Sequence, residues 1–197
     1  MPSPHDHKGV TTTTITSENL LTVDDLLRLY SEGIRGELIR GVRCETIPTG
    51  LTHGEIAMNL GSELRNFTKP RRLGRVAGSD FGVLLERDPD TVREPDVAYI
   101  SAQKLPLEIR SPGFWEGIPD IVAEIVSPSD SPQEVFDKAR MWISFGAALV
   151  WTVDPETRTV EVHRPNQPQL KLSDDDTLDG GQVLAGFSCP VRDLFDL

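Results

Sequence analysis

Three charged residues, far apart in the sequence, stand where a folded chain keeps few charges without a functional reason. Asp96 opens the run 97–100, whose β-branched and aromatic side chains indicate a buried strand that starts just after Pro95. Glu124 interrupts the otherwise apolar run 121–126, a pattern typical of an interior strand covered on both faces. Because burying an unpaired charge is costly, Glu124 must be paired with a cation, protonated or bound to a metal ion.

The third residue, Lys138, belongs to a predicted helix whose start and end are both marked. Ser131 and Glu134 have the spacing of a capping box, the proline between them fits the first helical position, and Gly146 is placed to end the helix. At about 3.6 residues per turn, Lys138 falls on the apolar side of this helix. A lysine on an inward face needs an anionic partner, and Glu124 lies on the preceding strand.

Two carboxylates and a lysine at strand ends resemble the active site of the PD-(D/E)XK nuclease superfamily. Five blocks, in order, are similar to the Uma-type restriction endonuclease family: GELIRG, LTHGEIAMNL, GSDFGVLL, EPDVAYIS and DIVAEIVSPSD. The resemblance covers nearly the whole chain after about Ser17 and departs from the superfamily pattern at Val126, where the motif's lysine belongs. In the Uma-type family that lysine is displaced to the following helix, so the resemblance implies that Lys138 takes its role.

The resemblance implies a metal-dependent endonuclease that hydrolyses phosphodiester bonds in DNA. Asp96 and Glu124 would hold Mg²⁺, or Mn²⁺ in its place, together with the carbonyl of Ile125. Mg²⁺ prefers such oxygen ligands and retains several waters. The ion would activate a bound water, and Lys138 would orient or help deprotonate that water and neutralise the scissile phosphate.

Three further residues have both a functional and an ordinary structural interpretation. His53 falls on the apolar side of a predicted helix, where a packed, hydrogen-bonded histidine is the commoner case. Glu37 would otherwise be an exposed charge at a strand end, and Asp80 a turn residue that bonds its own backbone. By resemblance, His53 and Glu37 are accessory catalytic groups, and Asp80 is a third acid around the cation.

The same residues leave two other functions open. A nuclease-like domain without catalysis could act as an oligomeric binding module, which Val126 at the motif-lysine position and the net acidity both permit. A glycoside hydrolase would also use two carboxylates, Asp96 and Glu124. It would leave Lys138 without a task, and the chain lacks the aromatic density that sugar sites usually show.

The net charge of −11 is unusual for a nuclease, because affinity for nucleic acid depends largely on Lys and Arg neutralising phosphates. The acidity is not uniform, since four cations occur within seven positions: Lys69, Arg71, Arg72 and Arg75. We predict that this loop contacts DNA; the alternative is an ordinary solvated loop.

At 197 residues and 38% apolar, the chain has enough material for one domain with a sizeable core. We expect a tail without fixed structure at 1–16 and a single nuclease-like domain at 17–197.

Cys44 and Cys189 lack metal-ligand spacing and indicate free thiols in a reducing compartment. Without a signal peptide or membrane span, the expectation is a soluble cytoplasmic protein. A homodimer is expected because a small acidic monomer offers little cationic surface.

Strand and helix patterns alternate along the chain and predict the α/β or α+β class, with a mixed central β-sheet flanked by helices. The resemblance implies a restriction-endonuclease-like core. Residues 81–85, 97–100, 121–126 and 148–153 would form the sheet, covered by helices at 53–67 and 132–145. The first of these helices has a second apparent capping box, Thr52 and Glu55. Smaller elements are predicted as a helix at 23–30, hairpins around 40–41 and 154–157, and extended segments at 169–172 and 183–185.

Overall fold

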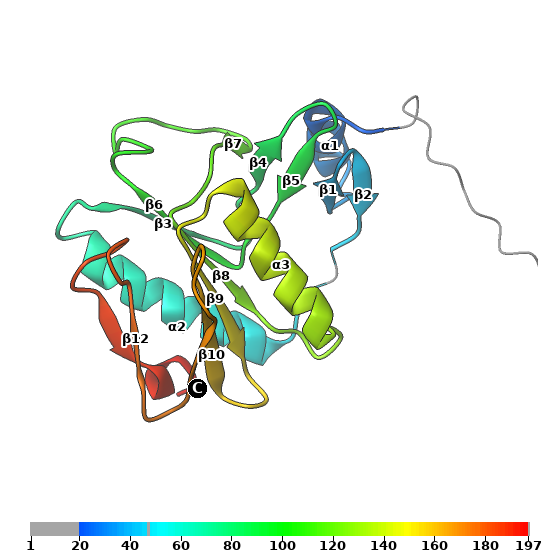
Figure 1. The fold of residues 1–197 in the computed structure, drawn as a ribbon. Coiled ribbons are helices and arrows are strands. Elements are labelled where there is room, and N and C mark those ends of the chain that lie inside the picture. The colour runs from blue at the N-terminus through cyan, green and yellow to red at the C-terminus, as the bar shows by residue number, and fades with distance from the viewer. Residues whose placement is uncertain (1–19, 47, 197) are drawn as a thin grey trace, which may run out of the picture.

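The computed structural model describes residues 20–46 and 48–196, so the tail predicted at 1–16 lies outside the described residues. The chain forms a six-stranded sheet, a five-stranded sheet and a two-stranded ribbon, with helices packed against them (Figure 1). This arrangement confirms the predicted class, a mixed α+β fold with helices flanking a central sheet.

The six-stranded sheet is the centre of the structure. β8 and β9 are parallel neighbours, and every other adjacent pair in this sheet is antiparallel. Helix α3 (Pro132–Phe145) makes the crossover that a parallel pair requires. In spatial order the strands are β11 (Leu170–Leu172), β10 (Thr159–His163), β9 (Leu149–Asp154), β8 (Ile121–Ile125), β6 (Val97–Ser101) and β3 (Gly74–Gly78).

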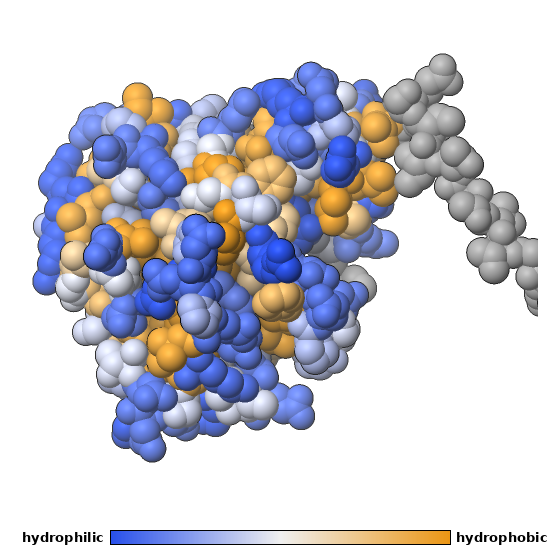
Figure 2. All heavy atoms as spheres, viewed as in Figure 1, coloured by the Kyte–Doolittle hydropathy of each residue, from blue (hydrophilic) through white to orange (hydrophobic). Residues whose placement is uncertain are grey.

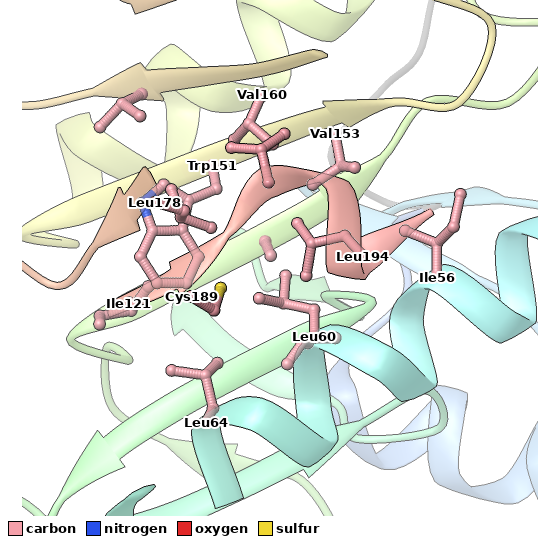
Figure 3. Close-up of a cluster of buried hydrophobic side chains, with 14 of the residues drawn as sticks. Ile56, Leu60, Leu64, Ile121, Trp151, Val153, Val160, Leu178, Cys189 and Leu194 are labelled. Carbon is pink, nitrogen blue, oxygen red and sulfur yellow. The ribbon is translucent and has the colours of Figure 1, made fainter. Parts of the chain in front are cut away.

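Each face of this sheet is covered by one long helix. Leu60 of α2 (Leu51–Thr68) shares an apolar cluster with Trp151 of β9 (Figure 3). Trp142 of α3 belongs to a separate cluster with Val122 of β8. Since side chains two residues apart on a strand point to the same face, Glu124 also points toward α3.

The five-stranded sheet packs with α1 (Val23–Ser31) around Leu26, Leu38 and Val92. Its strands in spatial order are β2 (Val42–Cys44), β1 (Glu37–Ile39), β5 (Thr91–Arg93), β4 (Val83–Glu86) and β7 (Trp115–Glu116). Only three residues of the chain separate the end of β5 from the start of β6 in the larger sheet. Asp96 is the last of these three residues, so it lies in the connection between the two sheets.

The C-terminal segment is anchored on α2. It forms β12 (Thr177–Asp179), β13 (Ser188–Pro190) and a 3₁₀ helix, η2 (Val191–Leu194). The side-chain amide of Asn59 in α2 donates hydrogen bonds to the carbonyl oxygens of Leu194 and Asp196, each at 3.2 Å. Buried Leu194 also joins the α2 cluster (Figure 3), so this segment completes the core on that face.

Several local predictions are confirmed. Ser131 and Glu134 form the predicted capping box of α3, and Gly146 ends that helix in the left-handed conformation with φ of 110°. The hairpin turn at 40–41 and the β9–β10 hairpin form where the turn signals indicated. Both cysteines are free thiols.

Three local predictions are wrong. Thr52 does not cap α2, because the helix already begins at Leu51 with Gly50 as the N-cap and no side-chain cap bond. The strand predicted at 81–85 forms β4 in the smaller sheet, while β3 pairs with β6. Residues 183–185 form turns. An apolar run indicates a strand, but the choice of neighbouring strand depends on contacts distant in sequence.

The surface carries apolar residues scattered among hydrophilic ones on the face seen in Figure 2. Within residues 20–46 and 48–196, none of the helices combines the length and the apolar character needed to cross a membrane.

Candidate active site

The larger sheet brings Asp96 and Glu124 to the same end of two neighbouring strands. β6 starts directly after Asp96 and runs antiparallel to β8, with Val97 opposite Ala123. One carboxylate oxygen of Asp96 accepts a hydrogen bond from the backbone N–H of Ile125 at 2.8 Å. The start of β6 is thereby fixed to the end of β8, next to Glu124.

Glu124 is buried, and its two carboxylate oxygens have different partners on α3. Oε1 accepts a hydrogen bond of 2.7 Å from the indole Nε1 of Trp142. Oε2 lies 2.8 Å from the ammonium of Lys138. The glutamate side chain is 6% exposed and the lysine side chain 34%, so the pair spans from the interior to the surface.

Burial and neighbouring charges together shift the pKa values of Glu124 and Lys138. Burial raises the pKa of Glu124 to about 7; the charge of Lys138 opposes this rise, and that of Asp96 adds to it. Burial also lowers the pKa of Lys138, but attraction to Glu124 and Glu37 outweighs it and leaves that pKa above its usual value. Burial therefore dominates the shift of Glu124, and attraction to the nearby acids dominates that of Lys138.

His53 approaches from α2, on the other side of the β8 end. Its Nε2 lies 3.3 Å from a carboxylate oxygen of Asp96, and its Nδ1 lies 3.2 Å from the hydroxyl of Thr49. Burial lowers the pKa of His53, but the hydrogen bond and charge of Asp96 outweigh this and raise it overall. Asp96 therefore contacts two parts of the site. It pairs with His53, which lies on one face of the sheet, and it accepts a hydrogen bond from the backbone N–H of Ile125, next to Glu124.

Glu37 lies at the start of β1, buried rather than exposed. Its Oε1 accepts a hydrogen bond of 2.7 Å from the backbone N–H of Glu94 and lies 3.1 Å from Nε of Arg93. The charge of Glu37 raises the pKa values of both Glu124 and Lys138. Glu37 therefore acts on Glu124 and Lys138 through its charge, while its carboxylate is bound by Arg93 and by the backbone N–H of Glu94.

Two residues that the sequence interpretation did not single out border the site on this side. The hydroxyl of Tyr30 donates a hydrogen bond to Glu94, and burial raises the pKa values of both. Asp80 has a φ of 69°, and its charge also raises the pKa of Glu94. The charge of Asp80 thus acts on Glu94. Glu94 could have been suspected from its place two residues before Asp96.

Trp142 is a further residue of the site that the sequence interpretation missed, as the hydrogen-bond donor to Glu124. The available signal was its position four residues after Lys138, which places both side chains on the same side of the helix. A buried indole N–H generally needs a partner.

A cavity of about 500 Å³ opens beside His53. Its walls are the first turn of α2, the residues that follow β8 and the β9–β10 turn: 50–53, 126–128 and 154–156. A substrate lying here would be adjacent to the imidazole and to the β8 end.

The basic loop lies at the other end of the sheet. Lys69 is 16 positions after His53, and at about 1.5 Å per helical residue the two ends of α2 are about 24 Å apart. Arg71 covers the ring of Phe67, Arg72 pairs with Glu108 at 3.0 Å, and Arg75 donates to carbonyl oxygens of the 106–109 loop. The structure therefore does not bring these cations together with the two acids.

The donor set at the β8 end suits a hard cation that keeps part of its water shell. Asp96 and Glu124 carry carboxylate oxygens and Ile125 a carbonyl oxygen, and burial, with the charge of Asp96 added, raises the pKa of Glu124. Throughout the described parts of the chain, no three or more His, Cys, Asp or Glu side chains form a complete ligand group. Mg²⁺ usually binds through one or two carboxylates plus waters and substrate phosphates, so two acids suffice.

Residues 23–192 match the Uma2 family, which is described as "Putative restriction endonuclease". None of the curated proteins searched matches the chain. The fold is similar to that of a crystal structure from Anabaena variabilis ATCC 29413, described as a "putative nuclease belonging to DUF820". The TM-score is 0.74 at 24% identity, over 89% of this chain and 97% of that one.

The family match spans most of the chain, and it includes every residue of the site described above, from Tyr30 to Trp142. The chain therefore belongs to the Uma2 family.

Proposed function

We propose that this protein is a metal-dependent endonuclease that hydrolyses phosphodiester bonds in DNA. The observation that carries the proposal is the ion pair between buried Glu124 and partly exposed Lys138, 2.8 Å apart, beside Asp96 at a sheet end. A buried ion pair is weak support for stability, and strongly perturbed carboxylates beside a cavity are typical of functional sites. Membership of a family described as restriction endonucleases supports the same reaction.

Asp96, Glu124 and the carbonyl of Ile125 would hold Mg²⁺ or Mn²⁺. When bound, such an ion supplies Lewis acidity, which lowers the pKa of a coordinated water and offsets the growing charge on the phosphate. Asp80 is the proposed third acid near the ion; in the structure its charge raises the pKa of Glu94.

Three side chains would orient the attacking water, supply a proton and set the charge around the site. Lys138 orients the attacking water and places a positive charge next to the scissile phosphate. His53, whose raised pKa favours the imidazolium form, would donate a proton to the departing oxygen as the bond between that oxygen and phosphorus breaks. The attacking water would bond to phosphorus and release its proton to bulk solvent. Glu37 is an accessory group that adds negative charge near Lys138 and favours its protonated state.

DNA would extend from this site toward the basic loop. Over about 24 Å, at about 3.4 Å per base pair, the duplex would cover about seven base pairs. Lys69 and Arg71 are the exposed cations best placed to contact phosphates there. If they do, replacing both by alanine reduces the dependence of DNA affinity on salt concentration by about two phosphate contacts. We also propose a homodimer, which sedimentation equilibrium would test, because a second copy doubles this small cationic surface.

The test is cleavage of supercoiled plasmid by the purified protein at low salt with Mg²⁺ or Mn²⁺. We expect nicked and linear products with the wild type, and loss of at least about 100-fold in rate with Asp96→Asn or Glu124→Gln.

Asp120→Asn is a matched control. Asp120 lies at the opposite end of the same strands, accepts a 2.7 Å hydrogen bond from the backbone N–H of Ser101, and pairs with Lys104 at 3.0 Å. Its replacement should leave cleavage unchanged. If wild type and Asp96→Asn convert plasmid equally slowly, the enzyme proposal fails, and the binding-module alternative gains support if the protein still retards DNA in a gel.

A further inference from the structure

Trp142 is fully buried in α3, and its indole nitrogen contacts the buried carboxylate of Glu124. Nε1 donates to Oε1 of Glu124 at 2.7 Å, while Lys138, four residues earlier, takes Oε2 at 2.8 Å. One face of α3 therefore contacts both carboxylate oxygens of Glu124: the indole N–H donates a hydrogen bond to Oε1, and the ammonium forms an ion pair with Oε2.

We propose that Trp142 is a positioning residue that holds the Glu124 carboxylate in the orientation required to bind a divalent cation; this inference rests on the proposed function. Two fixed contacts determine the plane of a carboxylate, whereas one contact leaves it free to rotate. Lys138 alone does not fix the orientation of the Glu124 carboxylate, because its ammonium ends a flexible four-carbon stem and its side chain is partly exposed. The indole is rigid, and it is fully buried in a close-packed core.

Trp151 shows that this core does not need an indole N–H for packing. It is also fully buried, in the cluster on the opposite face of the sheet (Figure 3). Its Nε1 has no hydrogen-bond partner anywhere in the described chain. The two tryptophans thus fill similar volumes, and only Trp142 uses its N–H on a side chain of the site.

This comparison supplies a matched pair of variants, Trp142→Phe and Trp151→Phe. Both shorten a buried aromatic ring system, but only the first removes a donor from Glu124. Loss of a residue that orients a metal ligand typically weakens metal affinity or activity by about 10–100-fold. We expect Trp142→Phe to weaken Mn²⁺ binding in calorimetry by about that factor, and Trp151→Phe to leave it within about twofold of wild type.

A second measurement needs neither metal nor activity. The chain has three tryptophans, so its indole N–H resonances are few enough to assign. Glu124→Leu should shift the Trp142 indole N–H resonance strongly upfield, and Glu124→Gln, which keeps an acceptor, should shift it less. The resonance of Trp151 should move little in either variant. Replacing Trp142 by 3-benzothienylalanine, which substitutes sulfur for the N–H at nearly constant shape, guards against misfolding of the phenylalanine variant.

Equal Mn²⁺ affinities in Trp142→Phe and Trp151→Phe, with both folded, would overturn the inference, and so would an indole resonance insensitive to Glu124→Leu. If the wild type binds no Mn²⁺, the proposed function fails separately. In that case the resonance shifts still decide whether Trp142 holds the carboxylate.

Discussion

Replacing Lys138 by methionine removes the charge that faces Glu124 while keeping an unbranched side chain of similar length. Removing one partner of a fully buried pair typically costs about 3–5 kcal/mol, because the other charge is left uncompensated. The lysine side chain is 34% exposed, so water screens part of its attraction. We therefore expect Lys138→Met to lower the free energy of unfolding by about 2 kcal/mol at pH 8.

The size of this loss should depend on pH in a defined direction. Burial raises the pKa of Glu124 to about 7 in the folded protein, and removing Lys138, whose charge opposes that rise, moves the pKa higher still. Well below pH 7 the carboxyl group is protonated in both proteins, and the lysine has no charged partner to lose. The destabilisation should therefore be under about 1 kcal/mol at pH 5 and should grow as pH rises through about 7.

Guanidinium unfolding followed by tryptophan fluorescence at pH 5 and pH 8 measures this difference directly. Arg140→Met, an exposed charge change on the same helix, is the control and should cost less than about 0.5 kcal/mol at either pH. In a Glu124→Gln background, Lys138→Met should lose its pH dependence. An equal loss at pH 5 and pH 8, or a pH dependence that survives Glu124→Gln, would refute the reasoning.

Three other outcomes are expected. Asp96→Asn removes the charge that raises the pKa of His53, so an NMR titration should show that pKa falling below its wild-type value; an unchanged value would mean that the pair is not formed. Gly146→Ala places a side chain at a φ of 110° and should lower the free energy of unfolding by about 1 kcal/mol in thermal or denaturant unfolding. Gly54→Ala, inside α2 with open space around the added methyl group, should instead raise it by about 0.5–1 kcal/mol, and the opposite signs make the two glycine variants controls for each other.

Local sequence signals were sufficient where one element's own hydrogen bonds decide its limits. The boundaries of α3 follow from Ser131, Glu134 and Gly146, whose capping contacts are all within one turn of the helix. The same reasoning failed at Thr52, because a glycine N-cap two residues earlier leaves no signal as strong as a capping box. Local rules therefore predict that a helix exists more reliably than where it begins.

Strand pairing was not available from the pattern of apolar residues. β3 and β4 follow each other in the chain, yet β3 is the edge of the larger sheet and β4 lies inside the smaller one. The difference comes from their partners: β3 pairs with β6, whereas β4 pairs with β5, which follows it directly, and with the more distant β7. Apolar periodicity records that a side chain is buried but not which neighbour buries it.

By itself, the sequence determined which residues could do chemistry: an acid at a strand start, a second acid within an apolar strand, and a lysine on the inward side of a helix. Only the tertiary structure decided their partners. It assigned the two oxygens of Glu124 to Lys138 and Trp142, joined His53 to Asp96, and left the basic loop at the far end of α2. The physical reason is that burial and charge type are properties of a residue, whereas a hydrogen bond depends on where two distant segments meet.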